Sequence, residues 1–171
     1  MIFELETDRL RLRHFLLDDA DFILALLNQP SFIHFIGDKG VKTADDAKDY
    51  IATGPINSYQ QHGFGLYLVE AIDNKTAIGM CGLLKRESLM HPDLGFAFLP
   101  DYWGKGYAFE AATAVLAYAR DDLRLPHVLA ITRPDNEASI KLLERLGFHF
   151  EEMIELPDDV KLFSLTTCET P

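Results

Sequence analysis

The stretch LPDYWGKGYAFEAATAVLAYAR, from Leu99 to Arg120, places two glycines around a lysine between an apolar run and an alanine-rich segment. Alanines and Val115 recur on one face of residues 105–121, which predicts a helix. Gly104-Lys105-Gly106 then lies where the first N–H groups of a helix have no internal partner. Those donors and the positive end of the helix dipole suit a phosphate group, although a plain strand-to-helix turn would use the same residues.

Two well-known phosphate motifs do not fit this stretch. A P-loop requires Ser or Thr after its lysine, whereas Gly106 follows Lys105. A dinucleotide fingerprint requires a small residue where this chain has Phe109, and an acidic residue after the following strand, which ends at Thr132-Arg133. The sequence therefore argues against kinase, NTPase and dehydrogenase activities.

The rest of the chain alternates predicted strands and helices around this junction. Strands are predicted over residues 9–15, 63–72, 77–86, 93–99, 127–132, 148–153 and 160–166. Helices are predicted over 18–29, 43–61 (interrupted at Gly54-Pro55), 105–121 and 136–146, and Thr43 with Asp46 has the spacing of a capping box. The order β-α-α-β-β-β-α-β-α-β-β predicts an α/β fold in which helices cover a mixed sheet. We expect a single domain over residues 1–171, with a core spanning 8–167.

Composition indicates a soluble globular protein with an acidic surface. Sixteen Lys and Arg residues against 27 Asp and Glu give a net charge of -11. This charge opposes binding to nucleic acid or anionic membranes and attracts cationic amines. The chain has neither a signal-peptide pattern nor an apolar run of roughly 20 residues, so we expect a cytoplasmic protein. The two cysteines and six histidines lack metal-ligand spacing, and we expect no metal.

Two motifs carry a resemblance to a known family. LGFAFLPDYWGKGYAFEA (94–111) and TRPDNEASIKLLERLGF (132–148) resemble the GNAT superfamily of acetyl-CoA-dependent N-acetyltransferases. The branch that acetylates ribosomal-protein N-termini (RimJ/RimL type) is the most similar, and the likeness extends from LETDRLRLRHF (5–15) to the final strands. The family's [QR]-x-x-G-x-[GA] motif matches residues 103–108, with Trp103 where Gln or Arg is usual.

The resemblance implies a GNAT fold with a central, mostly antiparallel sheet. The strand over 93–99 would carry a bulge and splay away from the strand over 127–132, and acetyl-CoA would enter the resulting V. Its pantetheine would pair with the backbone near Phe98 and Leu99, and one of those two amides would polarise the thioester carbonyl. Its pyrophosphate would rest on the loop and the first helical turn. The cofactor-binding residues implied there are Trp103, Gly104, Lys105, Gly106, Tyr107 and Ala108, with Phe109 at the edge.

The second motif differs from the family pattern at one chemical position. Many members read N-x-x-A-x-x-x-Y, and their tyrosine protonates the departing thiolate; here Leu143 stands in its place. Asn136 and Ser139 share a helical face, and the resemblance implies that Asn136 bonds the pantetheine while Ser139 contacts the thiol. The alternative is that Asn136 is only an N-cap and Ser139 only a tolerated small residue.

The proton acceptor and the amine site are less clearly marked in the sequence. Asp93 stands just before Leu94-Gly95, where the branch often has a catalytic Glu; it either accepts the ammonium proton, directly or through water, or is a solvated carboxylate. His91 is a second candidate base. The segment Ser31–Val41, predicted as a loop, offers His34 and Phe35 as acceptor contacts, unless its aromatic side chains simply plug the core.

These residues predict an enzyme that moves an acetyl group from acetyl-CoA to a primary amine in a ternary complex. The acceptor would be a small amine or the N-terminus of a peptide or protein, and a homodimer is the default oligomer. The alternative is a non-catalytic acyl-CoA-binding module, which the missing tyrosine suggests.

Overall fold

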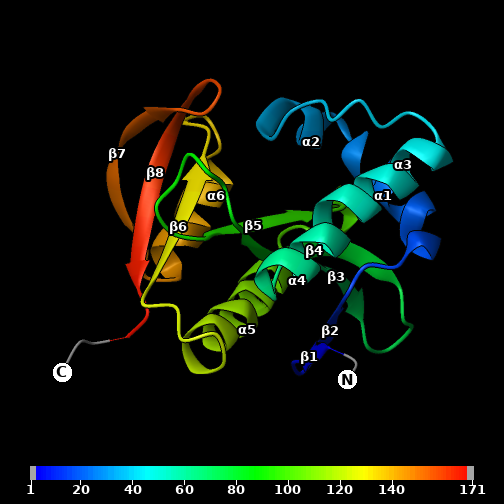
Figure 1. The fold of residues 1–171 in the computed structure, drawn as a ribbon, viewed down its shortest axis with the longest axis horizontal. Helices are drawn as coiled ribbons and strands as arrows, with labels where there is room; N and C mark the ends of the chain where they lie inside the picture. Colours follow the sequence, from blue (N-terminus) through cyan, green and yellow to red (C-terminus); the bar gives the residue numbers. More distant parts are fainter. Residues whose placement is uncertain (1–2, 169–171) are drawn as a thin grey trace.

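One eight-stranded sheet organises residues 3–168, the part of the chain that the computed structural model describes (Figure 1). The spatial order of the strands is β1-β2-β3-β4-β5-β6-β8-β7. Every neighbouring pair is antiparallel except β5 and β6, which are parallel. The strands are β1 (Glu4–Glu6), β2 (Leu10–Arg13), β3 (Leu66–Ala71), β4 (Ala77–Leu84), β5 (Asp93–Phe98), β6 (His127–Thr132), β7 (His149–Glu155) and β8 (Asp159–Thr166). The predicted α/β fold with a mostly antiparallel sheet is confirmed.

Helices cover both faces of this sheet. They are α1 (Ala20–Leu27), α2 (Pro30–Phe35), α3 (Ala44–Ile51), α4 (Asn57–His62), α5 (Tyr107–Asp121) and α6 (Glu137–Arg145). The predicted capping box starts α3: Thr43 Oγ1 accepts from the Asp46 amide, and Asp46 Oδ2 accepts from the Thr43 amide, both at 3.1 Å. Gly54-Pro55 does not break the helix after α3, because Ala52–Ile56 forms a wide π-helical turn that accommodates the proline and leads into α4.

The segment predicted as a loop between the first two helices contains a helix of its own. Pro30 occupies the first turn of α2, where its fixed φ angle favours a helix and its missing N–H costs nothing. Phe32 on α2 is buried in the core against α1 and α3, whereas His34 is exposed. The prediction of a loop over Ser31–Val41 was therefore wrong for residues 31–35, and a single buried side chain gives too little periodicity to reveal so short a helix.

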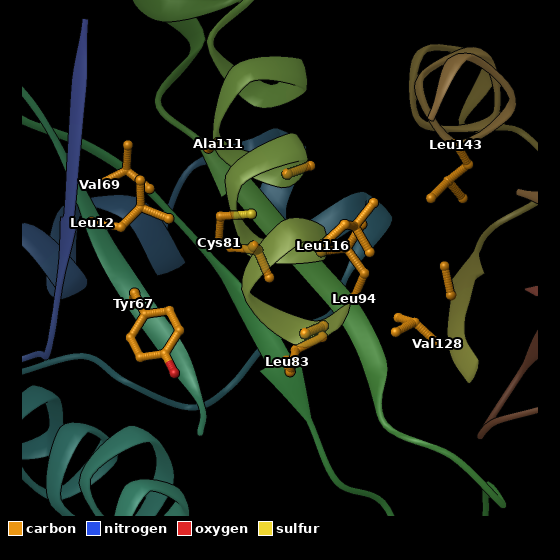
Figure 2. Close-up of a cluster of buried hydrophobic side chains, with 14 of the residues drawn as sticks. Leu12, Tyr67, Val69, Cys81, Leu83, Leu94, Ala111, Leu116, Val128 and Leu143 are labelled. Atoms are coloured by element: carbon orange, nitrogen blue, oxygen red, sulfur yellow. The ribbon is translucent and has the colours of Figure 1, made fainter. Parts of the chain in front are cut away.

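Two apolar layers hold the helices to the sheet. In Figure 2, Ala111 and Leu116 of α5 lie over Cys81 and Leu83 of β4. Val128 of β6 lies beyond Leu94 of β5, on the side away from β4. The other layer packs α1, α2 and α3 against the opposite face of β3 and β4. Side chains of β5 alternate between these layers: Leu94 and Phe98 belong to the α5 layer, and Ala97 and Leu99 to the other.

The parallel strands β5 and β6 separate almost as soon as they meet. Their one register pair is Asp93 with Leu129, next to a hydrogen bond from the Leu129 amide to the Pro92 carbonyl at 2.9 Å. Beyond this point β5 stays with β4 and β6 stays with β8, so the sheet opens as a V between β5 and β6 (Figure 1). The one register pair puts the apex of this V at Asp93.

The predicted bulge in β5 is absent. Its pairing with β4 runs without a shift from Leu84–Asp93 to Gly79–Phe98. Register shifts occur instead in β3–β4, at Val69/Glu70, and in β7–β8, at Phe150/Glu152. Because each arm of the V keeps its other neighbour along its whole length, the two strands diverge without a bulge.

Candidate active site

The end of β5 presents one free backbone edge to the V. The Leu99 amide donates to the Ile78 carbonyl of β4 at 2.9 Å, so it is not available to a ligand in the V. Successive residues of a strand direct their N–H and C=O groups to opposite sides, so the Phe98 amide points away from β4 and toward β6. The expectation of two backbone partners is thereby corrected to one, Phe98.

Trp103 contacts the same backbone edge at the end of β5. Its indole N–H donates to the Phe98 carbonyl at 2.9 Å, and about half of the residue is exposed. The tryptophan in the usual Gln or Arg position thus ties the loop to the strand through its ring nitrogen, leaving the Phe98 amide as the free group.

The loop that follows is built to bring backbone amides close to an anion. Gly104 and Gly106 have φ angles of +71° and +82°, which favour glycine strongly, and a Cβ at Gly104 would meet nothing within 4 Å. The first hydrogen bond of α5 joins the Glu110 amide to the Gly106 carbonyl at 3.1 Å, so the amides of Tyr107, Ala108 and Phe109 lack a helical acceptor. Lys105 is exposed beside them. These features fit a diphosphate.

On the β6 arm, Asn136 caps α6. Its Oδ1 accepts from the Ser139 amide at 3.2 Å, so the N-cap interpretation accounts for this oxygen, whereas the side-chain NH₂ group takes no part in the cap. Ser139 is half-buried in the first turn. Leu143 is only 1% exposed and packs in the core, so this position offers no proton donor to the V.

Asp93 is buried at the apex of the V rather than solvated. Its side chain is 1% exposed, and the Arg86 Nε lies 3.1 Å and 3.3 Å from its two oxygens. By the alternation of β5, the side chain lies on the face covered by α1–α3. Burial raises the pKa of Asp93 to about 6, against the opposing effect of the Arg86 charge. The solvated-carboxylate alternative is therefore wrong.

Sequence reasoning missed Arg86, which lies in the connection between β4 and β5, seven residues before Asp93. The charge of Arg86 also acts on Tyr50 of α3, whose pKa is raised by burial and partly lowered by the guanidinium. The sequence did contain a signal for this pair. The two ends of the β4–β5 connection must lie close together, and Arg86 stands near one end and Asp93 at the other.

The two predicted acceptor residues lie across the opening of the V. His34 Nε2 is 2.8 Å from Asp135 Oδ2, which connects α2 with the β6–α6 loop, and Arg133 Nε is 3.1 Å from the other carboxylate oxygen. Phe35 packs edge-on against His34, with ring centroids 4.6 Å apart. His91 lies 4.9 Å from the ring of His127 at the start of β6. His34 is thus occupied by a carboxylate of the other arm.

Within residues 3–168, no group of three or more His, Cys, Asp and Glu side chains is arranged to hold a metal ion. No helix in that part of the chain is both long enough and apolar enough to cross a membrane.

A family profile described as an acetyltransferase (GNAT) domain matches residues 9–149, which includes the V, the loop and α6. The chain belongs to the GNAT acetyltransferase family. It is 31% identical over 156 residues to the uncharacterized Bacillus subtilis protein YkkB, covering 88% of both chains. It is 33% identical over 101 residues, 57% of this chain and 52% of the other, to the Escherichia coli ribosomal protein uS5-alanine N-acetyltransferase.

Solved structures confirm the GNAT fold. An acetyltransferase from Agrobacterium tumefaciens aligns with a TM-score of 0.82 at 22% identity, covering 96% of this chain and 95% of that one. The ribosomal-protein-S5-alanine acetyltransferase from Vibrio fischeri aligns with a TM-score of 0.80 at 20% identity, covering 96% and 97%. As a GNAT protein the chain is an acyltransferase that acts by acetyl transfer.

Proposed function

We propose that the protein transfers the acetyl group of acetyl-CoA to a primary amine by direct attack within a ternary complex. The observation that carries this proposal is the placement of a free β5 edge at Phe98 beside the glycine loop that starts α5. An extended pantetheine chain and a diphosphate need these two kinds of site in this order. A microcin C7 self-immunity acetyltransferase solved with acetyl-CoA and AMP shares the fold, with a TM-score of 0.79 at 17% identity.

Different residues around the V bind different parts of the co-substrate. The amides of Gly106 to Phe109 bind the pyrophosphate, and Lys105 adds a cation. The Phe98 amide, on the β5 arm of the V, and the Asn136 side-chain NH₂ group, on the β6 arm, bind the pantetheine part of the co-substrate. Acetyl-CoA, when bound, supplies a thioester carbonyl that a neutral amine can attack.

Two side chains handle the protons. Because Asp93 is almost fully buried, it takes the ammonium proton through a water molecule rather than by direct contact. Ser139, in the first turn of α6, donates a hydrogen bond to the departing sulfur in place of the usual tyrosine. Arg86 keeps the Asp93 carboxylate oriented.

Two acceptor classes are consistent with the relatives. The uS5-alanine N-acetyltransferase favours a protein N-terminus. A spermidine N-acetyltransferase chimera, which shares the fold with a TM-score of 0.76 at 20% identity, favours a small polyamine. Both classes occur in the cytoplasm, where we place the protein.

A thiol-release assay tests the proposal. The protein is mixed with acetyl-CoA and a panel of acceptors: peptides beginning with Ala or Ser, polyamines, amino acids and aminoglycosides. We expect CoA release with one class, together with a mass increase of the acceptor equal to one acetyl group. CoA binding with no release on any acceptor would instead support a non-catalytic acyl-CoA-binding module.

A further inference from the structure

The β1–β2 turn lies against the glycine loop, almost a hundred residues away in sequence. Arg9 Nη1 donates to the Lys105 carbonyl at 2.9 Å, and the Arg9 guanidinium carbon lies 4.4 Å from the centre of the Tyr107 ring. A Cβ atom at Gly106 would lie 3.4 Å from Arg9 Nη2. Arg9 therefore contacts Lys105 and Tyr107 and lies beside Gly106, which stands between them.

Glu110 fixes the guanidinium in this place. Its Oε2 accepts from Arg9 Nε and contacts Nη2, both at 2.7 Å. Its Oε1 accepts from the Arg9 amide at 2.9 Å and from the Thr7 hydroxyl at 2.6 Å. Burial raises the pKa of Glu110, but these hydrogen bonds outweigh it and hold the pKa below its usual value. The carboxylate is thus fully engaged, and the charge of Arg9 is compensated locally.

The bond to the Lys105 carbonyl determines the direction of the next amide. A trans peptide is planar, so the C=O of Lys105 and the N–H of Gly106 point in opposite directions. Because Arg9 holds the carbonyl on its own side, the Gly106 amide points to the opposite side of that peptide plane. A loop with two glycines at positive φ has many alternative conformations, so an external contact is needed to keep this one.

We propose that Arg9, locked by Glu110, is a positioning residue that orients the Lys105–Gly106 peptide so that its amide faces the diphosphate of acetyl-CoA. The inference rests on the proposed function, because it assumes that the diphosphate binds this loop. Arginine is needed because its planar fork reaches Glu110 with one edge and the Lys105 carbonyl with the remaining nitrogen. A lysine ammonium cannot hold both partners in this geometry.

The test compares two ligands that differ at the diphosphate. CoA affinity is measured by isothermal titration and pantetheine affinity by NMR titration, in the wild type and in Arg9→Lys. We expect Arg9→Lys to weaken CoA binding roughly 10- to 100-fold, the equivalent of one hydrogen bond to a charged group, and to leave pantetheine within about twofold. Glu110→Gln, which keeps the size of the side chain, should reproduce this pattern.

Arg11→Lys is the matched control. Arg11 lies on β2 close to Arg9 and pairs with Glu6 at 2.8 Å, away from the loop, so CoA binding should stay at the wild-type value. Hydrogen exchange gives a second readout: the Glu110 amide, which donates to the Gly106 carbonyl, should exchange faster in Arg9→Lys than in Arg11→Lys.

The outcomes separate the two proposals. Equal loss of CoA and pantetheine, or no loss of CoA, in a folded Arg9→Lys protein would overturn the positioning role while leaving the proposed function intact. Failure of the wild type to bind CoA at all would overturn the proposed function and the inference with it.

Discussion

At the scale of single residues, the carboxyl of Asp93 has the most unusual environment in the site. It lies at the one point where β5 and β6 pair, and its only charged partner at hydrogen-bond distance in residues 3–168 is Arg86. Its pKa of about 6 exceeds the value of about 3.9 expected in the unfolded chain, so the folded state binds the proton more tightly. The contribution of Asp93 to the free energy of unfolding is therefore present below about pH 4 and is lost as the pH rises to about 6.

Replacing Asp93 by Asn tests its role in proton transfer. The wild-type kcat/KM for the amine should rise with pH through about 6, because only the ionised carboxylate accepts a proton. Asp93→Asn should lose that rise and turn over about 100-fold more slowly, with CoA affinity retained. Initial rates measured from pH 5 to 9 check both expectations.

Glu87→Gln serves as the control for Asp93, because Glu87 is an exposed carboxylate in the same β4–β5 connection. It should leave the pH profile unchanged. An Asp93→Asn protein with the wild-type profile and rate would show that Asp93 only holds the apex of the V.

Replacing Ser139 by Ala tests the hydrogen bond to the departing sulfur. Turnover at saturating acetyl-CoA should fall about tenfold, the value of one hydrogen bond to a developing charge, because the thiolate loses its partner. The fold should be retained, since the contact that caps α6 uses the Ser139 amide and not its hydroxyl. Ser88→Ala, an exposed serine between β4 and β5, is the control. Unchanged turnover in Ser139→Ala would remove Ser139 from the chemistry.

At the scale of elements, the sequence predicted those parts of the fold that local chemistry determines. The capping box of Thr43 and the glycines before α5 carry their own signals, and α3 and α5 form as expected. The engagement of the Leu99 amide, the burial of Asp93 and the contact of Arg9 with the loop depend on which strands become neighbours. Those long-range pairings are not encoded in any window of residues. The resemblance to the family therefore suggested candidate site residues, but it could not predict which other residues contact them.

The contact between α2 and the β6–α6 loop predicts a restrained acceptor opening. His34→Ala removes the partner of Asp135 Oδ2, so the amides of residues 133–136 should exchange faster with solvent. The melting temperature should change little, because an exposed side-chain pair of this kind contributes at most about 1 kcal/mol. Asp38→Asn, which breaks the exposed Asp38–Lys42 pair at 3.4 Å, is the control. Unaltered exchange at 133–136 would contradict the restraint.

The two loop glycines predict a graded loss of CoA binding. Gly104→Ala meets open space and is opposed only by its positive φ, at a cost of about 1 kcal/mol, so CoA should bind several-fold more weakly. Gly106→Ala has the same strain and places its Cβ at contact distance, 3.4 Å, from Arg9 Nη2, so its loss should be at least as large. Gly40→Ala, with φ +70° and open space far from the loop in sequence, should lose a similar stability but no CoA affinity. Equal CoA affinities in all three proteins would contradict a phosphate-binding loop.

At the scale of the whole molecule, the surface charge and the loop act in opposite directions. The net charge of -11 repels an anionic co-substrate at long range, whereas the local amides and Lys105 attract it. The same field attracts a cationic acceptor toward the open side of the V. A groove of about 710 Å³ beside the β6–α6 loop is acidic on balance, since Asp135, Glu155, Asp158 and Asp159 line it with a single guanidinium, that of Arg133, which pairs with Asp135.

Salt should therefore raise the Michaelis constant for a basic acceptor but not the one for acetyl-CoA. Raising the ionic strength from about 0.02 to 0.2 M shortens the Debye length from roughly 20 Å to below 10 Å, which screens the field beyond the first contacts. The KM for a basic acceptor should rise several-fold, and the KM for acetyl-CoA should fall or stay constant. A pair of peptides that differ only in a Lys or a Glu at the second position separates charge from the amine itself. The Lys peptide should lose its advantage in high salt; an advantage that persists would show that direct contacts, rather than the acidic surface, select the acceptor.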